Sequence, residues 1–94
     1  MGYESVNGRL ASGKTVLLDG ATGTELQRRG VAMEPTAWCG PSALENAGVL
    51  AEIHRDYVAA GSQVITANTF ATSRMVLKAT GLAHRFEEIN RAAM

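Results

Sequence analysis

Residues 15–20 read TVLLDG, a short apolar run that ends directly in an aspartate and a glycine. Apolar or β-branched residues at four consecutive positions, Thr15 to Leu18, are typical of a strand buried on both faces, as in a parallel sheet. A second run of this kind spans Gln63 to Thr66. Because a helical pattern lies between them, the two runs predict a right-handed βαβ crossover with adjacent, parallel strands. The predicted fold class is therefore α/β.

Spacing and capping residues predict helices around the two runs. Thr22 and Glu25 form the pattern of a capping box, before a helix that ends at Gly30. After a loop-rich stretch, Asn46 is placed to cap a helix of about 13 residues that stops at Gly61. Its apolar residues recur at spacings near three and four, and they are Val49, Leu50, Ile53, Tyr57 and Val58. A final helix has apolar residues on one face, namely Phe86, Ile89 and Ala93.

The remaining N-terminal segment, residues 1–14, is polar and shows no periodicity, so we expect a flexible or loosely docked arm there. Residues 15–94 then form the main domain. Only two strands are predicted in it, and a parallel sheet of two strands is a poor independent domain. We interpret residues 15–94 as the N-terminal portion of a larger α/β protein, or as a chain that completes its sheet with a partner.

The composition disfavours several classes of function. Nine Lys and Arg balance nine Asp and Glu among 94 residues, so no basic surface favours nucleic acid or anionic lipid. Apolar stretches are only a few residues long and the first ten residues lack an apolar core, so we expect neither a membrane span nor a signal peptide. A single cysteine, Cys39, fits a reducing compartment, and we expect the protein in the cytoplasm.

Residues 8–15, GRLASGKT, match the phosphate-loop pattern G-x-x-x-x-G-K-[ST]. That loop binds phosphate because it follows a buried strand and opens a helix. Here a polar segment precedes the match and a predicted strand follows it, which inverts the order. A nucleotide-binding module remains an alternative function, and unchanged ATP affinity in a Lys14→Ala variant would remove it.

Polar residues follow both predicted strands, at the edge where α/β proteins place their chemistry. A carboxylate after the first strand can pair with an ammonium group, and backbone amides of the glycine-rich turn behind it can hold an anion, so a zwitterionic amino acid would satisfy both. The candidate binding residues are Asp19, Gly20, Ala21, Thr22, Gly23, Thr24, Asn68, Thr69 and Phe70. The alternative is that Asp19 only ties the turn together and Asn68 only makes a hydrogen bond at the loop entry.

Other reactive residue types lack the neighbours that chemistry needs. His54 has no second metal ligand at helical spacing, so it is expected to be packed or a polar surface residue, and His84, at the start of the last helix, is expected to face solvent. Cys39 lies beside Trp38 in a loop, and no base is placed near it, so we expect a small buried or half-exposed thiol.

Taken together, these motifs closely resemble the first third of the homocysteine S-methyltransferase family. The matching stretches are LLDGATGTELQRRG, the Trp38 loop, IHRDYVAAG, VITANTF and GLAHRFEEINRAA, in this order over residues 15–94. The resemblance implies a (β/α)8 TIM barrel, of which this chain would supply the N-terminal βα units. It also implies transfer of a methyl group to homocysteine, which gives methionine, from a small donor such as S-methylmethionine, betaine or a methylfolate.

The same resemblance implies roles for particular residues. Asp19 would face the substrate ammonium, the amides of Gly20 to Gly23 its carboxylate, and Asn68 to Phe70 the pocket wall. Zinc, held by three cysteines, would keep the substrate sulfur as a thiolate. Cys39 does not occupy one of those cysteine positions, so the zinc ligands are expected outside this chain, and the 94 residues alone are expected to be inactive. A non-catalytic fragment that self-associates through open sheet edges remains a second alternative.

Overall fold

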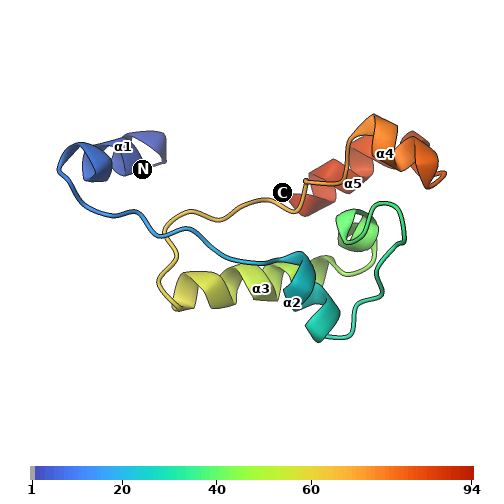
Figure 1. Cartoon of the computed structure of the whole chain (residues 1–94), viewed down its shortest axis with the longest axis horizontal. Coiled ribbons are helices and arrows are strands. Elements are labelled where there is room, and N and C mark those ends of the chain that lie inside the picture. The colour runs from blue at the N-terminus through green and yellow to red at the C-terminus, as the bar shows by residue number, and fades with distance from the viewer. Residues whose placement is uncertain (1) are drawn as a thin grey trace.

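The computed structural model describes residues 2–94, which form helices joined by extended segments (Figure 1). The α-helices are α1 (Tyr3–Ala11), α2 (Gly23–Arg28), α3 (Ala47–Ala59), α4 (Arg74–Ala79) and α5 (Phe86–Ala93). There are also two short 3-10 helices. The first, η1 (Gly40–Leu44), lies shortly before α3, and the second, η2 (Ala83–Arg85), lies directly before α5. Across residues 2–94, no helix combines the length and the apolar character needed to cross a bilayer.

The predicted fold class, βα units of a TIM barrel, is wrong for this structure, because no sheet forms within residues 2–94. The two apolar runs do lie side by side and parallel, as predicted, with a single bridge between Leu18 and Val64. Asp19 N donates to Val64 O at 3.1 Å, and Gln63 N donates to Leu17 O at 2.7 Å. A strand needs a longer ladder of such pairs, and two parallel segments without further neighbours are marginal. The runs therefore remain extended chain.

The faces of the first run are not covered by other elements, so apolar side chains lie in solvent. Leu17 is 51 % exposed and Leu18 is 59 % exposed, whereas the sequence predicted a strand buried on both faces. Self-association through these residues stays a prediction.

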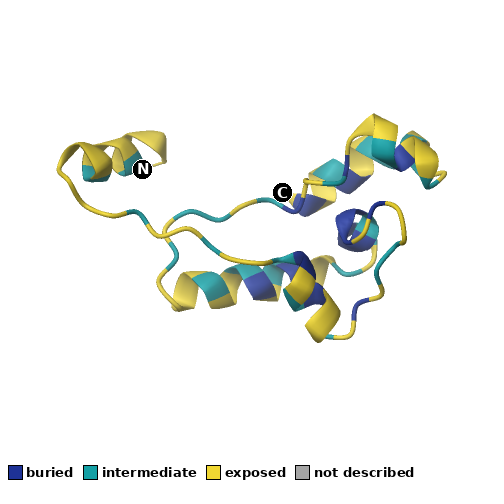
Figure 2. Cartoon of the chain, in the orientation of Figure 1, coloured by how far each residue is buried: buried dark blue, intermediate teal, exposed yellow. Residues whose placement is uncertain are grey.

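The core lies where α2, α3, η1 and α5 meet (Figure 2). Its buried members are Leu26, Val31, Cys39, Ala43, Leu50, Ile53 and Ala93. The prediction for α3 is confirmed in length, at 13 residues, and Gly61 follows it with a φ of +113°. Val58 was predicted to share the apolar face but is 56 % exposed, because the C-terminal end of α3 extends beyond α2 (Figure 2). For α5 the apolar face is confirmed, with Ile89 and Ala93 buried.

Helix α1 forms where the sequence predicted no regular structure. None of its residues, Tyr3–Ala11, is buried, and it lies apart from the other helices (Figure 1). The radius of gyration is 14.9 Å, above the value of about 12 Å typical of a compact domain of this length, because α1 extends the long axis. Loose docking of residues 1–14, and the domain boundary after them, stay predictions.

The phosphate-loop match falls on this helix and the turn after it. Gly8 lies inside α1, while Lys14 and Thr15 begin the exposed, extended segment that follows. The helix therefore precedes the Gly-Lys-Thr sequence instead of following it. Phosphate binding by this motif requires the opposite order, so the geometry does not support a nucleotide site at residues 8–15.

Ion pairs, rather than a capping box, organise α2. Thr22 makes no side-chain cap, and its backbone is already helical, whereas a capping residue is normally extended. The Glu25 side chain instead binds Arg28 of α2 and Arg29, the residue that follows the helix. Its carboxylate lies 2.7 Å from Arg28 Nε and 3.1 Å from Arg29 Nε, and Arg29 also donates to Asp56 of α3 at 2.8 Å. The hydrogen bond from Arg28, with a further one from Arg29, lowers the pKa of Glu25 to about 2.

This network predicts an acid-sensitive contribution to stability. The pKa of Glu25 is lower in the folded state, so its ion pairs stabilise the fold fully above about pH 4.5, and this contribution is lost as pH falls toward about 2. We expect the Tm difference between wild type and Glu25→Gln to shrink over that range. Glu52→Gln, at an exposed position of α3 without an ion pair within residues 2–94, should show no such change. A constant difference for Glu25→Gln would contradict the assignment.

Candidate functional site

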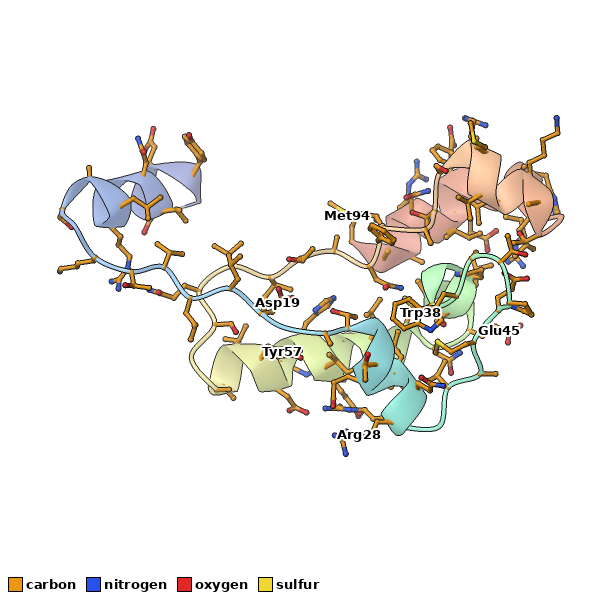
Figure 3. The ribbon with its side chains drawn as sticks, in the orientation of Figure 1. Asp19, Arg28, Trp38, Glu45, Tyr57 and Met94 are labelled. Atoms are coloured by element: carbon orange, nitrogen blue, oxygen red, sulfur yellow. The ribbon has the colours of Figure 1, made fainter. Side chains whose placement is uncertain are left out.

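Asp19 ends the first extended segment and is bonded to the second. Its Oδ2 accepts from Thr66 N at 2.9 Å, and its Oδ1 accepts from Thr66 Oγ1 at 3.0 Å. The carboxylate therefore ties the two extended segments together, whereas the structural alternative expected it to tie its own turn. A carboxylate has about four acceptor positions, so two remain for a ligand. Asp19 is half-buried, and Figure 3 shows it on the segment that runs above α3.

A hollow of about 280 Å³ opens beside Asp19, between the ends of both extended segments and the loop before η1. Six of the nine predicted binding residues line it: Asp19, Gly20, Thr22, Gly23, Asn68 and Phe70. Three do not, namely Ala21, Thr24 and Thr69. Sequence reasoning missed the other lining residues, which are Leu18, Trp38, Cys39, Thr66 and Ala67. The structure thus brings together polar residues from the ends of both runs.

The turn after Asp19 leaves backbone donors free. Within residues 2–94, the N–H groups of Gly20, Ala21 and Thr22 make no hydrogen bond. Tyr57 of α3 supports this turn from below, since its hydroxyl donates to Ala21 O at 2.9 Å (Figure 3). A Cβ on Gly20 would lie 2.9 Å from that hydroxyl, so a larger residue at this position would displace the Tyr57 side chain. The turn is held rigidly while its N–H groups stay available to an anion.

Trp38 forms the opposite wall of the hollow. Its φ of +53° lies in the left-handed region, which a bulky residue rarely adopts. A Cβ on Gly23 would lie 2.8 Å from the Trp38 ring and 2.9 Å from Cys39 Sγ. The loop of Trp38 and Cys39 therefore packs directly on the start of α2, and only glycine fits at position 23.

Cys39 and Asn68 join this loop to the second extended segment. Cys39 Sγ donates to Asn68 Oδ1 at 3.3 Å, and Asn68 Nδ2 donates to Cys39 O at 3.0 Å. Both residues are only 6 % exposed. Burial raises the pKa of the Cys39 thiol, so the neutral form that donates this bond is favoured. The prediction of a small buried thiol is confirmed, and its role here is structural.

A second pair of side chains, Thr72 and Asn90, fixes the chain beyond Asn68 by hydrogen bonds. Thr72 is buried, and its hydroxyl donates to Asn90 Oδ1 of α5 at 2.6 Å, while Asn90 Nδ2 donates to Thr72 O at 3.0 Å. Between Asn68 and Thr72, which are both held by these hydrogen bonds, Thr69 and Phe70 form an exposed bend, and Phe70 is 96 % exposed at the rim of the hollow. Buried anchors on both sides thus position an apolar side chain at the entrance.

Metal ligands do not gather in this part of the chain. Among residues 2–94, no three His, Cys, Asp or Glu side chains lie close enough together to hold a metal ion. The neutral, hydrogen-bonded thiol of Cys39 is unsuited to zinc, which binds the thiolate. Of the two histidines, His84 is exposed, and His54 has a buried Nδ1 that finds no hydrogen-bond partner among residues 2–94. The residues present do not fit the zinc site that the family resemblance implies.

The sequence was compared with models of protein families and with individual known proteins. Residues 16–94 match the model of the homocysteine S-methyltransferase family. The chain belongs to this family. A homocysteine S-methyltransferase of Escherichia coli (strain K12) is 43 % identical over 58 residues, which are 61 % of this chain and 19 % of that protein. Homocysteine S-methyltransferase YbgG of Bacillus subtilis (strain 168) is 29 % identical over 68 residues, 72 % of this chain and 22 % of that protein.

The chain thus spans about a fifth of the length of these homocysteine S-methyltransferases. No solved structure matches it. The matched residues include every residue that lines the hollow.

Proposed function

We propose that the full-length protein transfers a methyl group to the sulfur of homocysteine and so produces methionine. The observation that carries this proposal is the hollow beside Asp19, which lies within the family-matched residues and combines a carboxylate, free backbone N–H groups and an apolar wall. Homocysteine presents the complementary groups, an ammonium, a carboxylate and a short apolar side chain. The names of the two relatives support the same reaction.

In this proposal the residues of the chain bind and orient the amino-acid end of homocysteine. The two free acceptor positions of Asp19 pair with the ammonium group. The backbone N–H groups from Gly20 to Gly23 hold the carboxylate. Asn68 shapes the wall, Phe70 the entrance, and Thr69 lies in the exposed bend between them. In the reaction a bond forms between the homocysteine sulfur and the methyl carbon, the bond from that carbon to the donor breaks, and the sulfur loses its proton.

The methyl donor is a small molecule, and S-methylmethionine, betaine and a methylfolate are the candidates to test. Full-length protein is incubated in zinc-containing buffer with homocysteine and each donor in turn, and methionine is measured by mass spectrometry. We expect methionine with at least one donor and none when homocysteine is omitted. Absence of methionine with every donor, together with absence of homocysteine binding by calorimetry, would overturn the proposal.

A further inference from the structure

The Trp38 ring separates two hollows. One is the hollow beside Asp19, and the other, of about 250 Å³, lies on the far side of the loop and is lined among others by Glu34, Glu45 and Arg85. Trp38 lines both and is 45 % exposed, so the rest of the core does not enclose its ring. The ring packs against Gly23, where a Cβ would lie 2.8 Å from it, so the position of the ring sets this wall of the hollow beside Asp19.

The backbone conformation of Trp38 needs support, because a positive φ is strained for this residue. Glu34 supplies it through both backbone and side chain. Glu34 N donates to Trp38 O at 2.8 Å, and Trp38 N donates to Glu34 O at 2.7 Å. Its carboxylate Oε2 accepts from Thr36 N at 2.7 Å and also from Ala37 N, so one oxygen satisfies two N–H groups inside the turn.

We propose that Glu34 is a positioning residue, whose carboxylate closes the turn of residues 34–38 and so fixes the Trp38 ring against Gly23 as a wall of the substrate hollow. Ala37, whose N–H donates to the carboxylate, is fully buried at 0 % exposure, so the carboxylate acts on a buried part of the turn. The inference rests on the proposed function, since that function places homocysteine beside this wall. Glu34 itself lines only the far hollow and acts through Trp38.

The test combines fluorescence with kinetics in full-length protein. Emission from Trp38 is obtained as the difference between each protein and its Trp38→Phe counterpart, and its exposure is measured by acrylamide quenching. Glu34→Ala should increase the quenching of Trp38 and raise the KM for homocysteine roughly tenfold, because small displacements of a binding wall have effects of this order. The kcat should change less than the KM.

Two further variants sharpen the result. Glu34→Gln keeps one acceptor oxygen and should restore most of both properties, and it also serves as the readout if Glu34→Ala does not fold. Glu45→Ala is the matched control, because Glu45 lines the same far hollow but makes no hydrogen bond to the turn within residues 2–94. It should leave quenching and KM unchanged.

Unchanged quenching in Glu34→Ala would overturn the proposal, and so would increased quenching with an unchanged KM, or equal effects from Glu45→Ala. Failure of the proposed function is distinguishable. In that case the wild-type protein neither binds nor methylates homocysteine, and quenching alone decides whether Glu34 holds Trp38 in place.

Discussion

Asp19→Asn is expected to raise the KM of the full-length protein for homocysteine by about ten- to a hundredfold, with little change in the KM for the methyl donor. Asparagine keeps the shape of the side chain but removes the charge that pairs with the substrate ammonium. Loss of a charge-assisted hydrogen bond in a partly desolvated site costs about 1.5 to 3 kcal/mol. The effect is specific to homocysteine, because in the proposed function only its ammonium is held at this position.

The bonds between Asp19 and Thr66 supply the control for this prediction. Thr66→Val removes the hydroxyl that donates to Oδ1 and keeps the backbone N–H that donates to Oδ2. It should lower the free energy of unfolding by about 0.5 to 1.5 kcal/mol and raise the KM less than Asp19→Asn does. If Asp19→Asn lowers the Tm but leaves the KM of the folded protein unchanged, Asp19 has only a structural role and the binding assignment fails.

The helices after residue 20 were predictable because their signals are local. Periodicity located α3 and α5, and the glycines predicted to end helices, Gly30 and Gly61, do take positive φ values of +91° and +113°. The strands failed because an apolar run becomes a strand only when a ladder of backbone partners forms on it. Residues 15–20 and 63–66 form one bridge with each other and no further β-bridge among residues 2–94. Helix α1 was missed because it buries no residue, so no apolar periodicity marks it.

Part of the site could be predicted for a related reason. Asp19 and Asn68 come together because each follows one of two parallel segments. The two segments lie side by side even though no sheet forms, so the two residues still line the same hollow. Trp38 and Cys39 were not predicted to line the hollow. Their positions depend on a left-handed residue in the loop and on close packing against Gly23, and no local pattern specifies either.

The largest loss of stability is expected for Ile53→Ala. Ile53 is 0 % exposed and belongs to the buried cluster that joins α3 to Leu26 of α2. Truncation of an isoleucine at such a position removes its transfer free energy and leaves a cavity, so we expect the free energy of unfolding to fall by about 2 to 5 kcal/mol.

Val58→Ala is the matched control for this prediction. Val58 lies on the same helix but is 56 % exposed, so its truncation should change the free energy of unfolding by less than about 0.5 kcal/mol. Urea unfolding of both variants of the full-length protein, followed by circular dichroism, gives the comparison. Similar midpoints for the two variants would show that α3 does not pack through Ile53. A larger loss for Val58→Ala would place the C-terminal half of the predicted apolar face against the core, contrary to the structure.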